Sequence, residues 1–208
     1  LGIDLVAAPG AGCCGAVAYH LNAQAEGLDA MRRNIDAWWP EIEAGCEAIL
    51  VTASGCGVMV KDYGELLRDD DAYAEKAARV ASLARDPAEL LAGLDLSVLG
   101  QPGQGRRIAF HPPCTLQHGQ KLAGATERIL TRLGFLLTPV PDAHLCCGSA
   151  GTYSLTQPTL SGQLRADKLA ALESGGPELI ATANIGCQLH LEAGTALPVV
   201  HWLELLDR

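Results

Sequence analysis

Positive charge is scarce in this sequence of 208 residues, which has 15 Lys and Arg against 24 Asp and Glu and a formal net charge of −9. No Lys/Arg cluster is longer than Arg106-Arg107, so we expect no nucleic-acid partner. Its apolar runs fall far short of the ~18 residues that a membrane span needs. No signal peptide is visible, which favours a cytoplasmic protein.

Catalytic signals are also lacking. No Ser/His/Asp constellation and no pair of carboxylates stands out, so we predict no catalytic residue in this chain. Cysteine, in contrast, occurs eight times, and 49% of the residues are hydrophobic. Disulfide scaffolds are usually shorter than ~100 residues and have thin cores. The ample core here indicates a reducing setting in which thiolates serve metal or redox chemistry.

Short β-like runs alternate with helical patterns along the chain, which predicts an α/β fold with mostly parallel sheets and flanking helices. The predicted strands are 3–8, 48–53, 107–110, 136–140, 178–183 and 198–202. The predicted helices are 23–38, 57–67, 72–84, 87–92, 119–134, 158–173 and 186–193.

The sequence repeats itself. "CCG…AILVTASGCG" in the first half matches "CCG…LIATANIGCQ" in the second, with 41 and 39 residues between the cysteine pair and the following cysteine. We therefore predict two related lobes, residues 1–99 and 100–208, joined by the glycine-rich stretch 93–107. Cys114 precedes the second pair by 31 residues, and its counterpart would fall before residue 1. We expect the first lobe to be truncated at its N-terminus.

Seven cysteines follow strand-like runs. Because ligands gather beyond the carboxyl ends of parallel strands, we expect these cysteines to converge at one edge in each lobe. The two groups are Cys13, Cys14 and Cys56, and Cys114, Cys146, Cys147 and Cys187. Cys46 precedes its strand, and we expect a small buried hydrophobe or a free thiol there.

Adjacent cysteines favour an iron–sulfur cluster. Neighbouring Cα atoms lie ~3.8 Å apart, whereas a relaxed disulfide needs ~4.4–6.8 Å. Zinc sites usually use spaced pairs of cysteines, but neighbouring thiolates can reach different irons of one cluster. The alternative, a non-redox scaffold held by zinc or disulfides, stays open.

Four motifs together carry a resemblance that covers essentially the whole chain: "TASGCGVMVKDYGELLRDD", "HPPCTLQHGQK", "LCCGSAGTYS" and "ANIGCQLHL". They resemble the cysteine-rich CCG domain that occurs in heterodisulfide reductase and in iron–sulfur subunits of flavin-linked hydroxyacid dehydrogenases. The sequence of these motifs is most similar to the C-terminal part of glycolate oxidase (glycolate dehydrogenase) iron–sulfur subunits.

The resemblance implies an electron-transfer subunit that passes electrons from flavin subunits, which hold the FAD, toward a membrane quinone. It implies a [4Fe–4S] cluster at Cys114, Cys146, Cys147 and Cys187, and an incomplete first-lobe set at Cys13, Cys14 and Cys56. The expected location is the cytoplasm, including a peripheral position at the inner face of the membrane.

The sequence departs from the reductase pattern at its last cysteine. The reductase motif ends in CxxC, whereas this chain has His190 three residues after Cys187 and Met59 three residues after Cys56. This departure weighs against five-cysteine clusters and disulfide cleavage, although a heterodisulfide-reductase-like catalytic role stays an alternative. Like His190, the loop histidines His111, His118 and His144 could contact a cluster, but hydrogen-bonded loop positions are the plainer interpretation.

Overall fold

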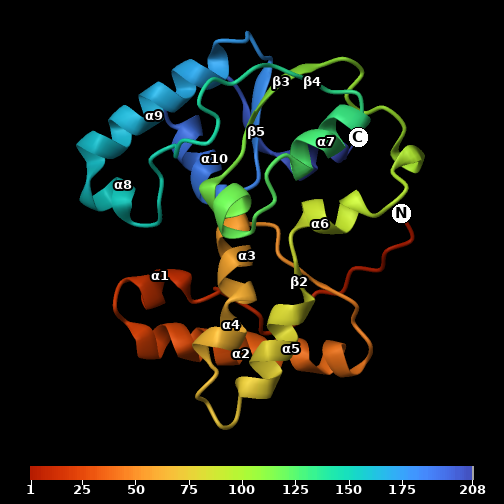
Figure 1. Cartoon of the computed structure of the whole chain (residues 1–208), viewed down its shortest axis with the longest axis vertical. Helices are drawn as coiled ribbons and strands as arrows, with labels where there is room; N and C mark the ends of the chain where they lie inside the picture. The colour runs from red at the N-terminus through yellow and green to blue at the C-terminus, as the bar shows by residue number, and fades with distance from the viewer. Residues whose placement is uncertain (208) are drawn as a thin grey trace. The chain divides into compact units, whose positions relative to one another are not determined.

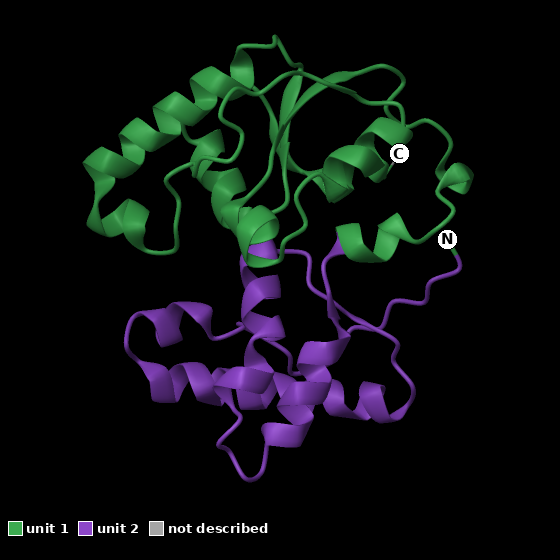
Figure 2. Ribbon diagram, viewed as in Figure 1, with its two compact units in different colours: residues 1, 88–208 green, residues 2–87 purple. Residues whose placement is uncertain are grey.

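The computed structural model describes residues 1–207 and divides into two compact units (Figure 2). The N-terminal unit comprises residues 2–87, and the C-terminal unit comprises residues 88 onward together with Leu1. Each unit combines parallel strands with flanking helices, as the predicted α/β class requires. The assignment of repeats to 1–99 and 100–208 stays a prediction.

The N-terminal unit has a two-stranded parallel sheet, in which β1 (Ile49–Leu50) pairs with β2 (Ala84–Arg85). Its helices are α1 (Ala16–His20), α2 (Gln24–Glu43), α3 (Ser54–Lys61), α4 (Tyr63–Leu66) and α5 (Ala74–Leu83). Met31, Tyr63 and Val80 are fully buried members of one core cluster. The apolar faces of α2, α4 and α5 therefore pack together in this unit.

The predicted strand at residues 3–8 is wrong. This segment has no regular structure, and the side chains of Leu5 and Val6 are 76% and 68% exposed. A strand needs a neighbouring strand to satisfy its backbone, and within residues 1–207 β1 pairs with β2 alone. The loop that carries Cys13 and Cys14 consequently does not follow a strand.

The C-terminal unit is built on a four-stranded parallel sheet in the order β4-β3-β5-β6 (Figure 1). The strands are β3 (Arg107–His111), β4 (Leu136–Leu137), β5 (Leu179–Thr182) and β6 (Val199–His201). The helices are α6 (Pro87–Ala92), α7 (Ala125–Arg132), α8 (Tyr153–Thr156), α9 (Pro158–Glu173) and α10 (Ile185–Glu192), with short helical turns η1 (Ser97–Leu99), η2 (Thr115–Gly119) and η3 (Trp202–Leu206).

Both faces of this sheet are buried. Ile108 and Phe110 of β3 belong to the core cluster that includes Ile129 of α7. Ala109, between them, belongs to a second cluster, which includes Leu172 of α9 and Leu191 of α10. Because successive strand side chains point to opposite faces, α7 covers one face and α9 and α10 cover the other. Strands of a sheet that is covered on both faces have nearly continuous apolar sequences, as the strands of this unit do.

The other predicted elements differ from the structure mainly in length. The predicted helices 87–92 and 158–173 coincide with α6 and α9. The predicted helix 57–67 is instead two helices, α3 and α4, and the linker 93–107 contains η1. Among the helices of residues 1–207, none combines the length and the apolar character needed to cross a membrane.

Candidate metal centre

Four cysteines of the C-terminal unit lie just beyond the carboxyl ends of neighbouring strands. Cys114 follows β3 by three residues, and Cys187 occupies the first turn of α10, directly after β5. Cys146 and Cys147 lie on the loop that leaves β4. These strand ends meet at one edge of the parallel sheet, where ligands of such folds bind.

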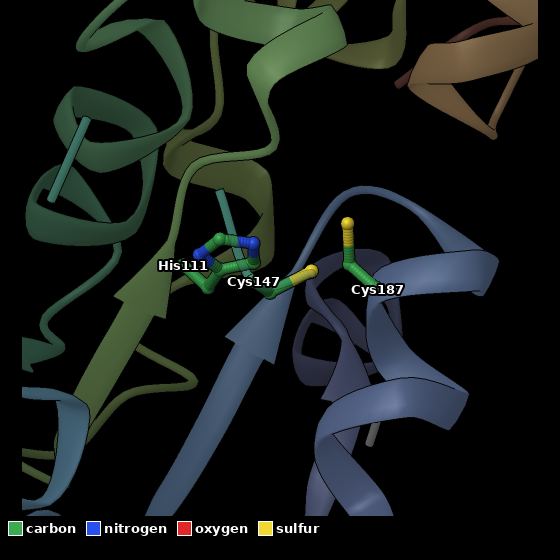
Figure 3. A group of neighbouring side chains, drawn as sticks. All are labelled: His111, Cys147 and Cys187. Atoms are coloured by element: carbon green, nitrogen blue, oxygen red, sulfur yellow. The ribbon is translucent and has the colours of Figure 1, made fainter. Parts of the chain in front are cut away.

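The four sulfur atoms form a chain of contacts. Cys146 shares hydrogen bonds with Cys114 and with Cys147, and Cys147 shares another with Cys187. The sulfurs of Cys147 and Cys187 and a ring nitrogen of His111 all lie within 4.8 Å of one another (Figure 3). The structure thus brings together all four cysteines that the sequence assigned to the second lobe, and it adds His111.

Along the chain of sulfurs, thiols with a raised pKa alternate with thiols whose pKa is lowered. Hydrogen bonds from Cys114 and Cys147 lower the pKa of Cys146 to about 2, and a hydrogen bond from Cys147 lowers that of Cys187 to about 6. The pKa values of Cys114 and Cys147 are raised, first by their hydrogen bonds to these neighbours and then by burial. Like charges this close cannot all form without compensation, and a bound cation removes that penalty.

Gly148 gives the CCG turn its shape. Its φ of +93° lies in the left-handed region, and an added Cβ would meet the backbone oxygen of Ser161 at 2.6 Å. The Gly148 N–H donates to the sulfur of Cys146 over 3.3 Å. The Ser161 hydroxyl donates to the Gly148 carbonyl at 2.8 Å and contacts Nε2 of His190 at 3.3 Å. His190 therefore supports the turn through Ser161.

Lys168 of α9 holds the loop that leads into this turn. It is only 3% exposed, and its Nζ donates to the carbonyl oxygens of Asp142 and Ala143 at 2.9 and 3.3 Å. Burial lowers the pKa of Lys168, and the neighbouring thiols Cys147 and Cys146 oppose that effect. A buried ammonium group beside several thiols is a partner for negative charge there.

The N-terminal unit brings its three predicted cysteines together as well. The sulfurs of Cys14 and Cys56 share a hydrogen bond at 3.2 Å, and the Cys13 side chain is also hydrogen-bonded to Cys14. The Cys56 thiol lowers the pKa of Cys14 to about 6, whereas that of Cys56 is raised, chiefly by its bond to Cys14. Cys56 lies in the first turn of α3, as Cys187 does in α10.

Asn34 fastens the first CCG loop. This fully buried side chain accepts from the Gly12 N–H at 2.8 Å and donates to the Cys13 carbonyl at 2.9 Å. The Tyr63 hydroxyl donates to the Cys14 carbonyl at 2.9 Å. Sequence reasoning missed both residues, although a polar Asn34 among the apolar positions of α2, next to Ile35, was a usable signal.

We predict that Asn34→Leu lowers the free energy of unfolding by about 2–4 kcal/mol, because the Gly12 N–H and the Cys13 carbonyl lose their partner. These bonds are only partly buried, so each loss should lie in the lower half of the ~1–3 kcal/mol range. Tyr63→Phe removes the hydroxyl that donates to the Cys14 carbonyl and accepts from Asn34 Nδ2, and we expect a loss of about 1–2 kcal/mol. Urea denaturation of the full chain measures both effects. A loss below about 0.5 kcal/mol for Asn34→Leu would show that the amide does not fasten the loop.

Cys46 and His118 lie in ordinary hydrogen-bonded positions. His111 does not occupy the hydrogen-bonded loop position expected for it, because it is the last residue of β3 and its ring faces the cysteines. The Cys46 thiol donates to the Ala48 carbonyl at 3.0 Å, at the start of β1. Nε2 of His118 lies 3.5 Å from the carbonyl oxygen of His144 and links their two loops. All eight cysteines, which fall within residues 1–207, are free thiols.

The donor set fits an iron–sulfur cluster. It consists of four sulfurs, three on connecting segments and that of Cys187 in the first turn of α10. Beside them lies the buried imidazole of His111, whose two nitrogens find no nitrogen or oxygen partner among residues 1–207. Thiolates select soft or borderline metals such as those of iron–sulfur clusters and zinc over Mg²⁺ and Ca²⁺. The site can therefore hold such a centre.

Fold and site together define a cysteine-rich α/β protein that presents sulfur donors for a metal centre at the edge of a parallel sheet. The chain belongs to the CCG cysteine-rich domain family, which matches residues 1–61 and 108–192. The matched regions contain both CCG motifs and the seven cysteines discussed above.

Three relatives illustrate the similarity. The "Glycolate oxidase iron-sulfur subunit" of Escherichia coli (strain K12) is 60% identical over 208 residues, which are 100% of this chain and 51% of that protein. The "Probable glycolate oxidase iron-sulfur subunit" of Bacillus subtilis is 29% identical, over 93% of this chain and 43% of its own length. "Lactate utilization protein A" of Bacillus licheniformis is 28% identical, over 100% of this chain and 87% of its own length. The chain thus spans about half the length of the first two relatives.

Proposed function

We propose that this chain is part of an iron–sulfur electron-transfer subunit in a flavin-linked glycolate or related 2-hydroxyacid dehydrogenase. The observation that carries the proposal is the convergence of Cys114, Cys146, Cys147 and Cys187 at the carboxyl edge of one sheet. Identity of 60% to a glycolate oxidase iron-sulfur subunit supports this assignment over other cysteine-rich proteins.

We assign a [4Fe–4S] cluster to these four cysteines, and Cys13, Cys14 and Cys56 form an incomplete set in the other unit. When bound, the cluster supplies a one-electron carrier. The residues of this chain would hold the cluster and fix the direction of its ligands. The CCG turn presents two thiolates from adjacent residues, and α10 presents a third near its N-terminus. His190 bonds Ser161 in the position of the reductase's fifth cysteine, which favours electron transfer over reductase-like chemistry.

The partners in this proposal are flavin-containing dehydrogenase subunits, which carry the FAD, and a quinone-type acceptor of the membrane. No pair of catalytic carboxylates or hydrolase-like constellation occurs in the sequence, so substrate oxidation is assigned to those flavin subunits. The assigned location is the cytoplasm, with peripheral attachment at the inner face of the membrane.

A mononuclear zinc site is the second candidate. His111, Cys147 and Cys187 place three donor atoms within 4.8 Å of one another, and zinc sites are built from four such nitrogen and sulfur donors. In that case the site is structural, and the chain carries no electrons.

Anaerobic reconstitution with iron and sulfide tests the two candidates against each other. We expect about four irons and four acid-labile sulfides per chain, with a brown protein that bleaches on reduction. The reconstitution is repeated with zinc and iron present together. A colourless protein that takes up stoichiometric zinc and no iron would replace the electron-transfer proposal by the structural one.

A further inference from the structure

His111 is placed on the same face of the sheet as the cysteine site. Along β3, Ala109 packs in the core cluster that contains Cys147 and Cys187, and Ile108 and Phe110 pack on the opposite face. His111 comes two residues after Ala109, so strand alternation directs its side chain toward this same cluster. Figure 3 shows the ring beside the two cysteine side chains.

The backbone around His111 is held firmly. Its carbonyl accepts from the Thr182 hydroxyl at 3.0 Å on the neighbouring strand β5. Pro112 follows, and a residue before proline is confined to extended conformations. The next carbonyl, that of Pro112, accepts from the Gln117 side chain at 3.0 Å. The backbone that carries the imidazole therefore cannot shift without breaking these bonds.

The imidazole is buried without a partner of its own. His111 is 1% exposed, and neither Nδ1 nor Nε2 has a nitrogen or oxygen hydrogen-bond partner among residues 1–207. A neutral imidazole carries one N–H donor, and burying it unpaired is costly. The sulfurs of Cys147 and Cys187 lie within 4.8 Å of one of its ring nitrogens.

We propose that His111 tunes the centre by donating its ring N–H to the sulfur of Cys187, while the four cysteines supply the metal bonds. This inference rests on the proposed cluster. A hydrogen bond to a ligand sulfur stabilises the more negative, reduced state, so His111 raises the reduction potential. His111 is a positioning and tuning residue in this assignment, and no metal bond is assigned to it.

The test compares His111→Leu, which lacks an N–H donor, with His111→Asn, which keeps one. Both are reconstituted anaerobically in the full chain, and the midpoint potential is measured by EPR-monitored titration. We expect wild-type iron content in His111→Leu, with a reduction equilibrium shifted about tenfold toward the oxidised state, which is ~59 mV for one electron. His111→Asn should recover part of that shift, which a merely structural role would not produce.

Several results would overturn the assignment. An unchanged potential in His111→Leu at full iron content removes the tuning role. Strong hyperfine coupling from a directly bound nitrogen in the ¹⁵N-labelled wild-type protein would make His111 a ligand. If His111→Leu fails to fold, His111→Asn and the wild-type spectrum still decide. Absence of iron from the wild type is the distinct result that would overturn the proposed function itself.

Discussion

Cys147→Ser is expected to abolish iron binding by the C-terminal unit. Cys147 is 1% exposed and shares hydrogen bonds with both Cys146 and Cys187, so it is one of the two inner members of the sulfur chain and the more buried of them. Serine offers a shorter, harder oxygen donor that does not replace a thiolate at a soft metal. After anaerobic reconstitution, iron and acid-labile sulfide should fall from about four per chain to below about one.

Cys46→Ser is the matched control, because the Cys46 thiol bonds only the nearby Ala48 carbonyl among the contacts assigned to it. This variant should keep the wild-type iron content. Cys14→Ser, in the N-terminal unit, should keep it as well and so assigns the iron to the C-terminal set. Retention of iron by Cys147→Ser, or its loss from Cys46→Ser, would refute the assigned ligands.

The position of the cysteines could be predicted from the sequence because it depends on topology. Cys114 and Cys187 follow buried, apolar strands, and parallel strands end at one edge of a sheet. The internal repeat supported the same arrangement. The segment 3–8 shows the limit of this reasoning, because its apolar run resembles a strand but, within residues 1–207, it pairs with no neighbouring strand.

The supporting residues were harder to predict because their roles arise from contacts distant in sequence. Asn34 reaches Gly12 across 22 positions, and Lys168 reaches Asp142 across 26. Neither contact leaves a periodic pattern. A sharper signal was available for His111, since the alternation of β3 already separates it from Phe110 and places it with Ala109.

Gly148→Ala should damage both the fold and the metal site. A non-glycine residue at a φ of +93° costs roughly 1–2 kcal/mol. The new Cβ would also lie 2.6 Å from the Ser161 backbone oxygen, and relieving such overpacking costs typically 1–3 kcal/mol. We therefore expect the free energy of unfolding to fall by about 2–4 kcal/mol in urea denaturation. Iron content should also fall, because the Gly148 N–H that bonds the Cys146 sulfur must move.

Gly162→Ala provides the matched comparison, since it adds the same methyl group next to Ser161. Gly162 lies inside α9, and an added Cβ meets nothing within 4 Å. Alanine in a helix interior is favoured over glycine by roughly 0.5–1 kcal/mol, so this variant should be slightly more stable and should bind iron normally. Equal stability and equal iron content in the two variants would mean that the turn does not depend on glycine. Opposite changes would instead connect the left-handed residue after the cysteine pair directly to the orientation of the two thiolates.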